Sequence, residues 1–153
     1  MDPVGVYAVA LIAALAAPIG AMAASPTKAS WANAANTICA RANAQVERLP
    51  SPTSSRILVS DLRAVGTIAT RASASLAAIP EPASELRQIE AFLAIGRRQT
   101  ALSLHKLLPA LQNDDSAAAL RLTRQIAALG SQYNAKARAL GAHACAVNPT
   151  PSG

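Results

Sequence analysis

Residues 116–140 read SAAALRLTRQIAALGSQYNAKARAL, and this stretch decides the fold class. Its apolar residues recur at every third or fourth position, which is the spacing of one face of an α-helix. Asp114 and Asp115 precede the stretch and Gly141 follows it, and these residue types favour the start and the end of a helix. We therefore predict one long amphipathic helix, with an apolar face made of Ala119, Leu122, Ile126, Leu129, Tyr133, Ala137 and Leu140.

Two prolines bound an earlier helix of the same kind. After Pro26, residues 27–49 are predicted to be helical up to Pro50, because proline breaks the hydrogen-bond ladder of a helix. The predicted apolar face consists of Trp31, Ala35, Ile38, Ala42, Val46 and Leu49. Asn36, Asn43 and Glu47 are predicted on the opposite side.

Two further segments with helical spacing lie between these. One begins at a Thr53 or Ser54 cap and ends before Pro80, and the other opens at Ser84 and runs to Leu111. Pro109 is expected to kink or end the last turn of the latter. Four amphipathic helices with short links predict an all-α fold, specifically an antiparallel up-down-up-down four-helix bundle.

The first 23 residues differ from the rest. An apolar run from Val4 to Ala17 is followed by Pro18, Gly20 and a small-residue site ending at Ala23. This order is typical of a signal peptide, whereas Pro18 and Gly20 interrupt the run short of the ~20 residues of a membrane span. We expect cleavage after Ala23 or Ala24, with an uncleaved anchor as the alternative. The predicted organisation is a signal peptide at 1–23, a helical domain at 24–146 and a flexible tail at 147–153, in a secreted or envelope-associated protein.

The chain has two cysteines, Cys39 and Cys145. An oxidising compartment favours a disulfide between them, with intermolecular pairing or free thiols as alternatives. The bridge would link the first helix to the C-terminal tail. Cys39 lies roughly 15 Å up the first helix, so the tail must turn at Gly141 and double back along that helix.

The mature chain is predicted to be basic. Removal of residues 1–23 removes Asp2 and no Lys or Arg, which leaves 14 basic against 7 acidic residues, a formal charge of +7. Such a surface attracts anionic polymers or lipid headgroups, although solubility alone also explains it. The candidate basic surface comprises Arg97, Arg98, Arg121 and Arg124. No aromatic ladder is interleaved with the basic residues, so nucleic-acid binding is not expected.

The sequence offers few candidate catalytic or metal-binding residues. His105 and His143 belong to no metal-binding spacing, and Asp114-Asp115 is typical of a helix cap. No nucleophile, acid and base occur in a recognisable arrangement. We predict no catalytic residue, no metal site, no cofactor and no enzymatic activity.

Two functional hypotheses follow. The first is a non-enzymatic envelope or extracellular protein whose basic surface contacts an anionic envelope polymer, a lipid surface or a protein partner. The alternative is a carrier that holds a small apolar ligand or cofactor inside the bundle. Trp31 and Tyr133 either line such a pocket or fill the core.

Several short motifs carry a resemblance to a protein group. They are Ile38-Cys39-Ala40-Arg41-Ala42-Asn43-Ala44, Leu49-Pro50, Tyr133, and Ala139-Leu140-Gly141 before Cys145. The chain resembles, over most of residues 28–146, a broad group of small exported actinobacterial all-helical proteins with one early and one C-terminal cysteine. The resemblance implies the helical fold and the disulfide, and it carries over no catalytic residue.

Overall fold

The computed structural model describes residues 24–51 and 54–146. The signal peptide predicted at 1–23 and the tail predicted at 147–153 lie outside the described residues. The described part is all-α and contains no strand, as predicted from the apolar spacing.

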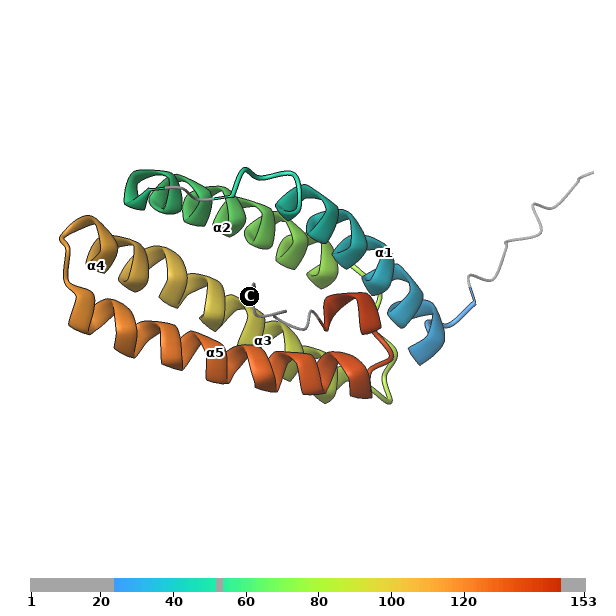
Figure 1. Ribbon diagram of the computed structural model, residues 1–153. Helices are drawn as coiled ribbons and strands as arrows, with labels where there is room; N and C mark the ends of the chain where they lie inside the picture. Colours follow the sequence, from blue (N-terminus) through green and yellow to red (C-terminus); the bar gives the residue numbers. More distant parts are fainter. Residues whose placement is uncertain (1–23, 52–53, 147–153) are drawn as a thin grey trace, which may run out of the picture.

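Four helices form the body of the molecule (Figure 1). Helix α1 spans Lys28–Val46, and α2 spans Ser55–Ala77. Helix α3, Leu86–Leu102, continues without a break through the π-helical turn η1, Ser103–Leu107, into α4, Leu108–Gln112. Helix α5, Ser116–Ala139, is followed by a short 3-10 turn, η2, at His143–Cys145.

The helix starts follow local capping chemistry. Thr27 and Ser30 form a capping box on α1, in which each side chain accepts a hydrogen bond from the other's backbone N–H, at 3.1 and 2.9 Å. Ser54 caps α2, and the Asp115 carboxylate accepts from the N–H of Ala118 at 2.9 Å on α5, as predicted. The predicted start at Ser84 is wrong: α3 begins at Leu86, and Glu85 occupies the cap position without a side-chain cap bond.

Pro109 does not end its helix. The helix continues to Gln112, and the chain turns only at Asp114, which has a left-handed φ of 55°. In the π-helical turn before the proline, the N–H of Leu108 bonds to the carbonyl of Ser103, five residues back. Proline lacks an N–H and its ring crowds the carbonyl four residues back, and the wider turn accommodates both defects.

The helices pack in two layers, α1 with α2 and α3–α4 with α5 (Figure 1). Helices α3 and α5 run antiparallel, because Gly96 meets Tyr133 while Gln99 meets Gly130. Among the described residues, the backbone of α1 approaches α2 and η2 but neither α3 nor α5. Helix α1 therefore does not pack directly on α5, and η2 contacts both helices. The up-down-up-down order stays a prediction.

The C-terminal turn is clamped to α1. Gly141 turns the chain with a φ of +79°, and the tail then runs back along α1, as predicted. The Asn36 amide donates to the Gly141 carbonyl at 3.0 Å and accepts from the N–H of Ala144 at 2.8 Å. The Asn43 amide donates to the Ala144 carbonyl at 2.9 Å. The prediction that both asparagines face away from the packed side is wrong, because their side chains hold the tail.

The disulfide between Cys39 and Cys145 is confirmed, with the two Cα atoms 5.0 Å apart. It lies at the end of η2, and both cysteines are buried. The bridge and the two asparagines therefore fix one short segment along two turns of α1. Around this segment lies the core, whose largest fully buried side chains are Trp31, Ile89, Phe92 and Leu140.

Candidate ligand-binding cavity

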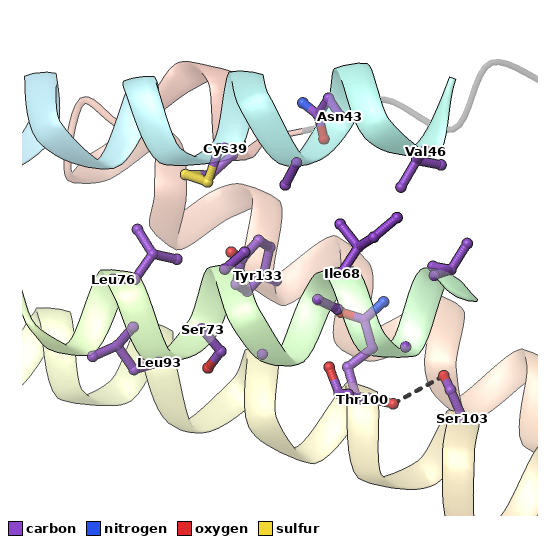
Figure 2. Close-up of a pocket in the computed structure, with 18 of the residues that line it drawn as sticks. Cys39, Asn43, Val46, Ile68, Ser73, Leu76, Leu93, Thr100, Ser103 and Tyr133 are labelled. Atoms are coloured by element: carbon purple, nitrogen blue, oxygen red, sulfur yellow. Dashed lines mark hydrogen bonds between the residues drawn. A yellow bond between two sulfur atoms is a disulfide. The ribbon is translucent and has the colours of Figure 1, made fainter. Parts of the chain in front are cut away.

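A cavity of about 270 Å³ lies inside the helical body, beside the disulfide (Figure 2). Helix α1 forms one wall, and α2 with α3 forms the other. Tyr133 is the contribution of α5. The wall residues are Cys39, Ala42, Asn43, Val46, Leu62, Val65, Gly66, Ile68, Ala69, Ala72, Ser73, Leu76, Leu93, Gly96, Gln99, Thr100, Ser103, Tyr133 and Cys145.

The cavity follows the second half of α1. It begins at the Cys39–Cys145 bridge and extends to Val46, whose side chain is 38% exposed. Because a wall residue at that end is exposed, the cavity reaches the surface near the C-terminal end of α1. The bridge forms the inner end.

Small side chains on α2 leave the space unfilled. Ala69 and Ala72 stand one turn apart on the wall, where the methyl group of alanine reaches only a short way toward α1. The other α2 contact is tight, because an added Cβ on Gly66 would overlap the Leu104 side chain. Helix α2 therefore packs closely on η1 at Gly66.

Tyr133 is held by aromatic packing. Its ring stacks on Phe92 with centroids 4.4 Å apart, and Phe92 in turn meets Trp31 edge-on at 6.0 Å. Gly96 allows this position, because an added Cβ there would lie 3.0 Å from the ring of Tyr133. Burial raises the pKa of Tyr133 to about 12, so its hydroxyl is protonated at neutral pH.

The two aromatic residues predicted as a pocket pair have different positions. Trp31 is 1% exposed in the core and is not part of the cavity wall, whereas Tyr133 lines the cavity. They do not meet, because Phe92 lies between them. The indole N–H of Trp31 is buried and meets no hydrogen-bond partner within residues 24–51 and 54–146.

The four arginines of the predicted basic surface are all exposed. Arg97 and Arg98 follow Gly96, which packs against Tyr133 of α5. Arg124 and Arg121 precede Tyr133 by nine and twelve residues, which places them about 13 to 18 Å farther along the bundle. Arg121 instead lines a second hollow with Lys106 and Asp115. The structure therefore does not bring the two pairs together into one compact patch.

The histidines and acidic residues considered as candidate site residues do not form a cluster in the described part of the chain. His105 and His143 are exposed on η1 and η2. Within residues 24–51 and 54–146, no three His, Cys, Asp or Glu side chains gather closely enough to hold a metal ion. Asp115 caps α5, as expected for a structural acid.

None of the helices within the described ranges combines enough residues with enough hydropathy to cross a bilayer.

Most of the cavity was not identified by sequence reasoning. The periodicity predicted which face of each helix is apolar, but not where two apolar faces fail to meet. The usable signal was the run of small residues Gly66, Ala69, Ala72 and Ser73 on one side of the second helix. Asn36 and Asn43, seven residues apart, were the corresponding signal for the tail clamp.

Comparison with known proteins does not assign the chain to a family. No protein-family model, curated protein or solved structure matches the chain. The resemblance to small exported actinobacterial helical proteins therefore stays a prediction.

Proposed function

We propose that this chain is an exported carrier that binds a small, mostly apolar ligand in the cavity between α1, α2 and α3. The observation that carries the proposal is the cavity of about 270 Å³, with aliphatic side chains on both walls. An engineered protein cavity of about 150 Å³ suffices to hold benzene. This cavity therefore has room for a ligand nearly twice that size.

The lining of the cavity favours an apolar occupant. Most of its wall residues are apolar, and the cavity opens near Val46, so without a ligand water contacts these side chains. Burial of an apolar molecule against such walls is favourable, at roughly 25 cal/mol per Å² of apolar surface removed from water. A bound ligand would also add dispersion contacts along the walls.

The surrounding structure favours a preformed site. The disulfide and the two asparagines hold η2 in place between α1 and α5. A site that is already open binds without first paying for rearrangement of its walls. Export is proposed from the apolar order of residues 1–23, and a disulfide is compatible with an oxidising compartment.

The envelope-binding hypothesis remains a prediction of second rank. It requires basic side chains that act together, and the four candidate arginines are divided between two places on the bundle. The cavity supports the carrier hypothesis more directly.

Native mass spectrometry of the protein exported by its own host tests the proposal. We expect a small-molecule adduct on the wild-type chain, or binding of added naphthalene if the natural ligand is lost during purification. Ala69→Leu should weaken both by occupying part of the cavity. Ala74→Leu is the matched control, because Ala74 lies on the same helix, exposed and outside the cavity wall.

A wild-type chain with neither adduct nor naphthalene binding would overturn the carrier proposal. So would equal binding by wild type and Ala69→Leu, because the ligand would then occupy another place.

A further inference from the structure

The walls of the cavity carry no formal charge. None of the described residues that line it is Lys, Arg, His, Asp or Glu. An ionised group transferred into such a site would lose its hydration and find no counter-ion, which is strongly unfavourable. The cavity therefore selects against carboxylates, phosphates and amines.

Tyr133 supplies one of the uncharged hydrogen-bond donors on these walls, beside Asn43, Ser73, Gln99, Thr100 and Ser103. Figure 2 shows Tyr133 in the space between α1 and α2, beneath the disulfide. Its hydroxyl makes no hydrogen bond to any described residue. A tyrosine hydroxyl in a mostly apolar setting normally finds a partner, because an unmade hydrogen bond costs stability.

Two of the other wall donors already make hydrogen bonds. Ser103 donates to the carbonyl of Gln99, four residues back, at 3.0 Å (Figure 2), and Asn43 donates to the carbonyl of Ala144 at 2.9 Å. Serine and threonine hydroxyls in a helix can bond to the carbonyl four residues back. The Tyr133 ring is too long to do this, so the acceptor for its hydroxyl must come from outside its own helix backbone, as a ligand would.

Size completes the description of the ligand. If about 150 Å³ accommodates the six carbons of benzene, a cavity of 270 Å³ accommodates about ten to twelve non-hydrogen atoms. The apolar majority of the wall residues requires that most of these atoms be carbon.

Building on the carrier function proposed above, we propose that the ligand is a neutral molecule of this size, with an apolar body and one acceptor oxygen that receives the Tyr133 hydroxyl. Tyr133 is then the residue that determines specificity for the acceptor. The high pKa of Tyr133 supports this role, because the hydroxyl remains a donor throughout the physiological pH range.

Calorimetric titration with three related probes tests this inference. The probes are 1-tetralone, which has a ring ketone, tetralin, which lacks the oxygen, and 1-naphthoate, which is an anion. Wild-type protein should bind 1-tetralone most tightly and 1-naphthoate at least about a hundredfold more weakly, because the carboxylate is desolvated without a partner.

Two variants separate the tyrosine from the other hydroxyls. Tyr133→Phe keeps the ring on Phe92 and should weaken 1-tetralone binding by about three- to tenfold, with tetralin unchanged, because one hydrogen bond is lost. Thr100→Val is the matched control from the same wall and should leave both affinities within about twofold.

The outcomes distinguish the two proposals. If no probe binds the wild-type chain, the carrier function itself fails. If 1-naphthoate binds as tightly as 1-tetralone, or if Tyr133→Phe binds 1-tetralone like wild type, the carrier stands and the neutral-acceptor inference is overturned. The comparison of probes uses the wild-type chain alone, so it remains decisive even if a variant does not fold.

Discussion

The two halves of α1 face the same gap between the helical layers but have opposite environments. In the N-terminal half, Trp31, Ala32 and Ala35 are buried, and Trp31 meets Phe92 of α3 edge-on. Beyond Cys39, no α1 residue is buried; Asn43 still holds the Ala144 carbonyl, but the cavity lies along this half. Helix α1 is therefore packed into the core at one end, whereas at the other end the C-terminal turn touches it without filling the space beside α2.

The largest expected effect comes from removing the Cys39–Cys145 disulfide, which lies between the two halves of α1. Replacing both Cys39 and Cys145 by Ser should lower the free energy of unfolding by about 4 to 5 kcal/mol, because the bridge closes a loop of 106 residues. Urea unfolding of the two proteins measures the difference. A loss below about 1 kcal/mol would mean that the asparagine contacts alone hold the tail.

Titration of the Tyr133 hydroxyl tests the environment of the cavity beside the C-terminal half of α1. The folded-state pKa of Tyr133, about 12, lies above the ordinary tyrosine value of about 10, so folding favours the neutral phenol. Its contribution is fully present below pH 10 and is lost as the pH rises from 10 toward 12, by about 2 to 3 kcal/mol in total.

Phenolate absorbance measures this directly, because Tyr133 is the one tyrosine beyond residue 23. Comparison with the urea-unfolded chain gives the shift. Equal titration curves for the folded and unfolded chains would show that the cavity exposes the ring to water.

The asparagine clamp is expected to contribute next. Asn36→Ala removes two hydrogen bonds to the tail backbone and leaves the Gly141 carbonyl and the Ala144 N–H without their partner, which should cost about 2 kcal/mol. Asn33→Ala is the control, because Asn33 is exposed on the same helix. Similar unfolding free energies for the two variants would refute the clamp.

The smallest expected effect comes from making the cavity beside the C-terminal half of α1 more densely packed, like the core beside its N-terminal half. Ala69→Leu places apolar atoms in the cavity and should raise the free energy of unfolding by about 1 kcal/mol. Ala74→Leu should change it by less than about 0.5 kcal/mol at its exposed site. Destabilisation by Ala69→Leu would indicate that the walls are closer together than the cavity volume implies.

Local structure was accessible from the sequence to a large extent. The apolar spacing around Leu122, Ile126 and Leu129 identified α5, and the residue types at Ser54 and Asp115 identified helix starts. Pro109 was expected to kink or end the last turn of a helix that reaches Leu111, and the helix does end close by, at Gln112. The rule for proline did not anticipate the π-helical turn that precedes it. Asn36 and Asn43 were assigned to the outer side, because periodicity alone treats an amide as a solvent-facing residue.

The all-α class, the approximate helix positions and the pairing of Cys39 with Cys145 could be read from the sequence, because each follows from short-range spacing or from a choice with one intramolecular solution. Three features emerged only once the helices were packed: η2 contacts both α1 and α5, Phe92 joins Trp31 to Tyr133, and Ala69 and Ala72 border an open space. Periodicity specifies which face of a helix is apolar, whereas a cavity depends on the distances between helices, which packing of the whole chain determines.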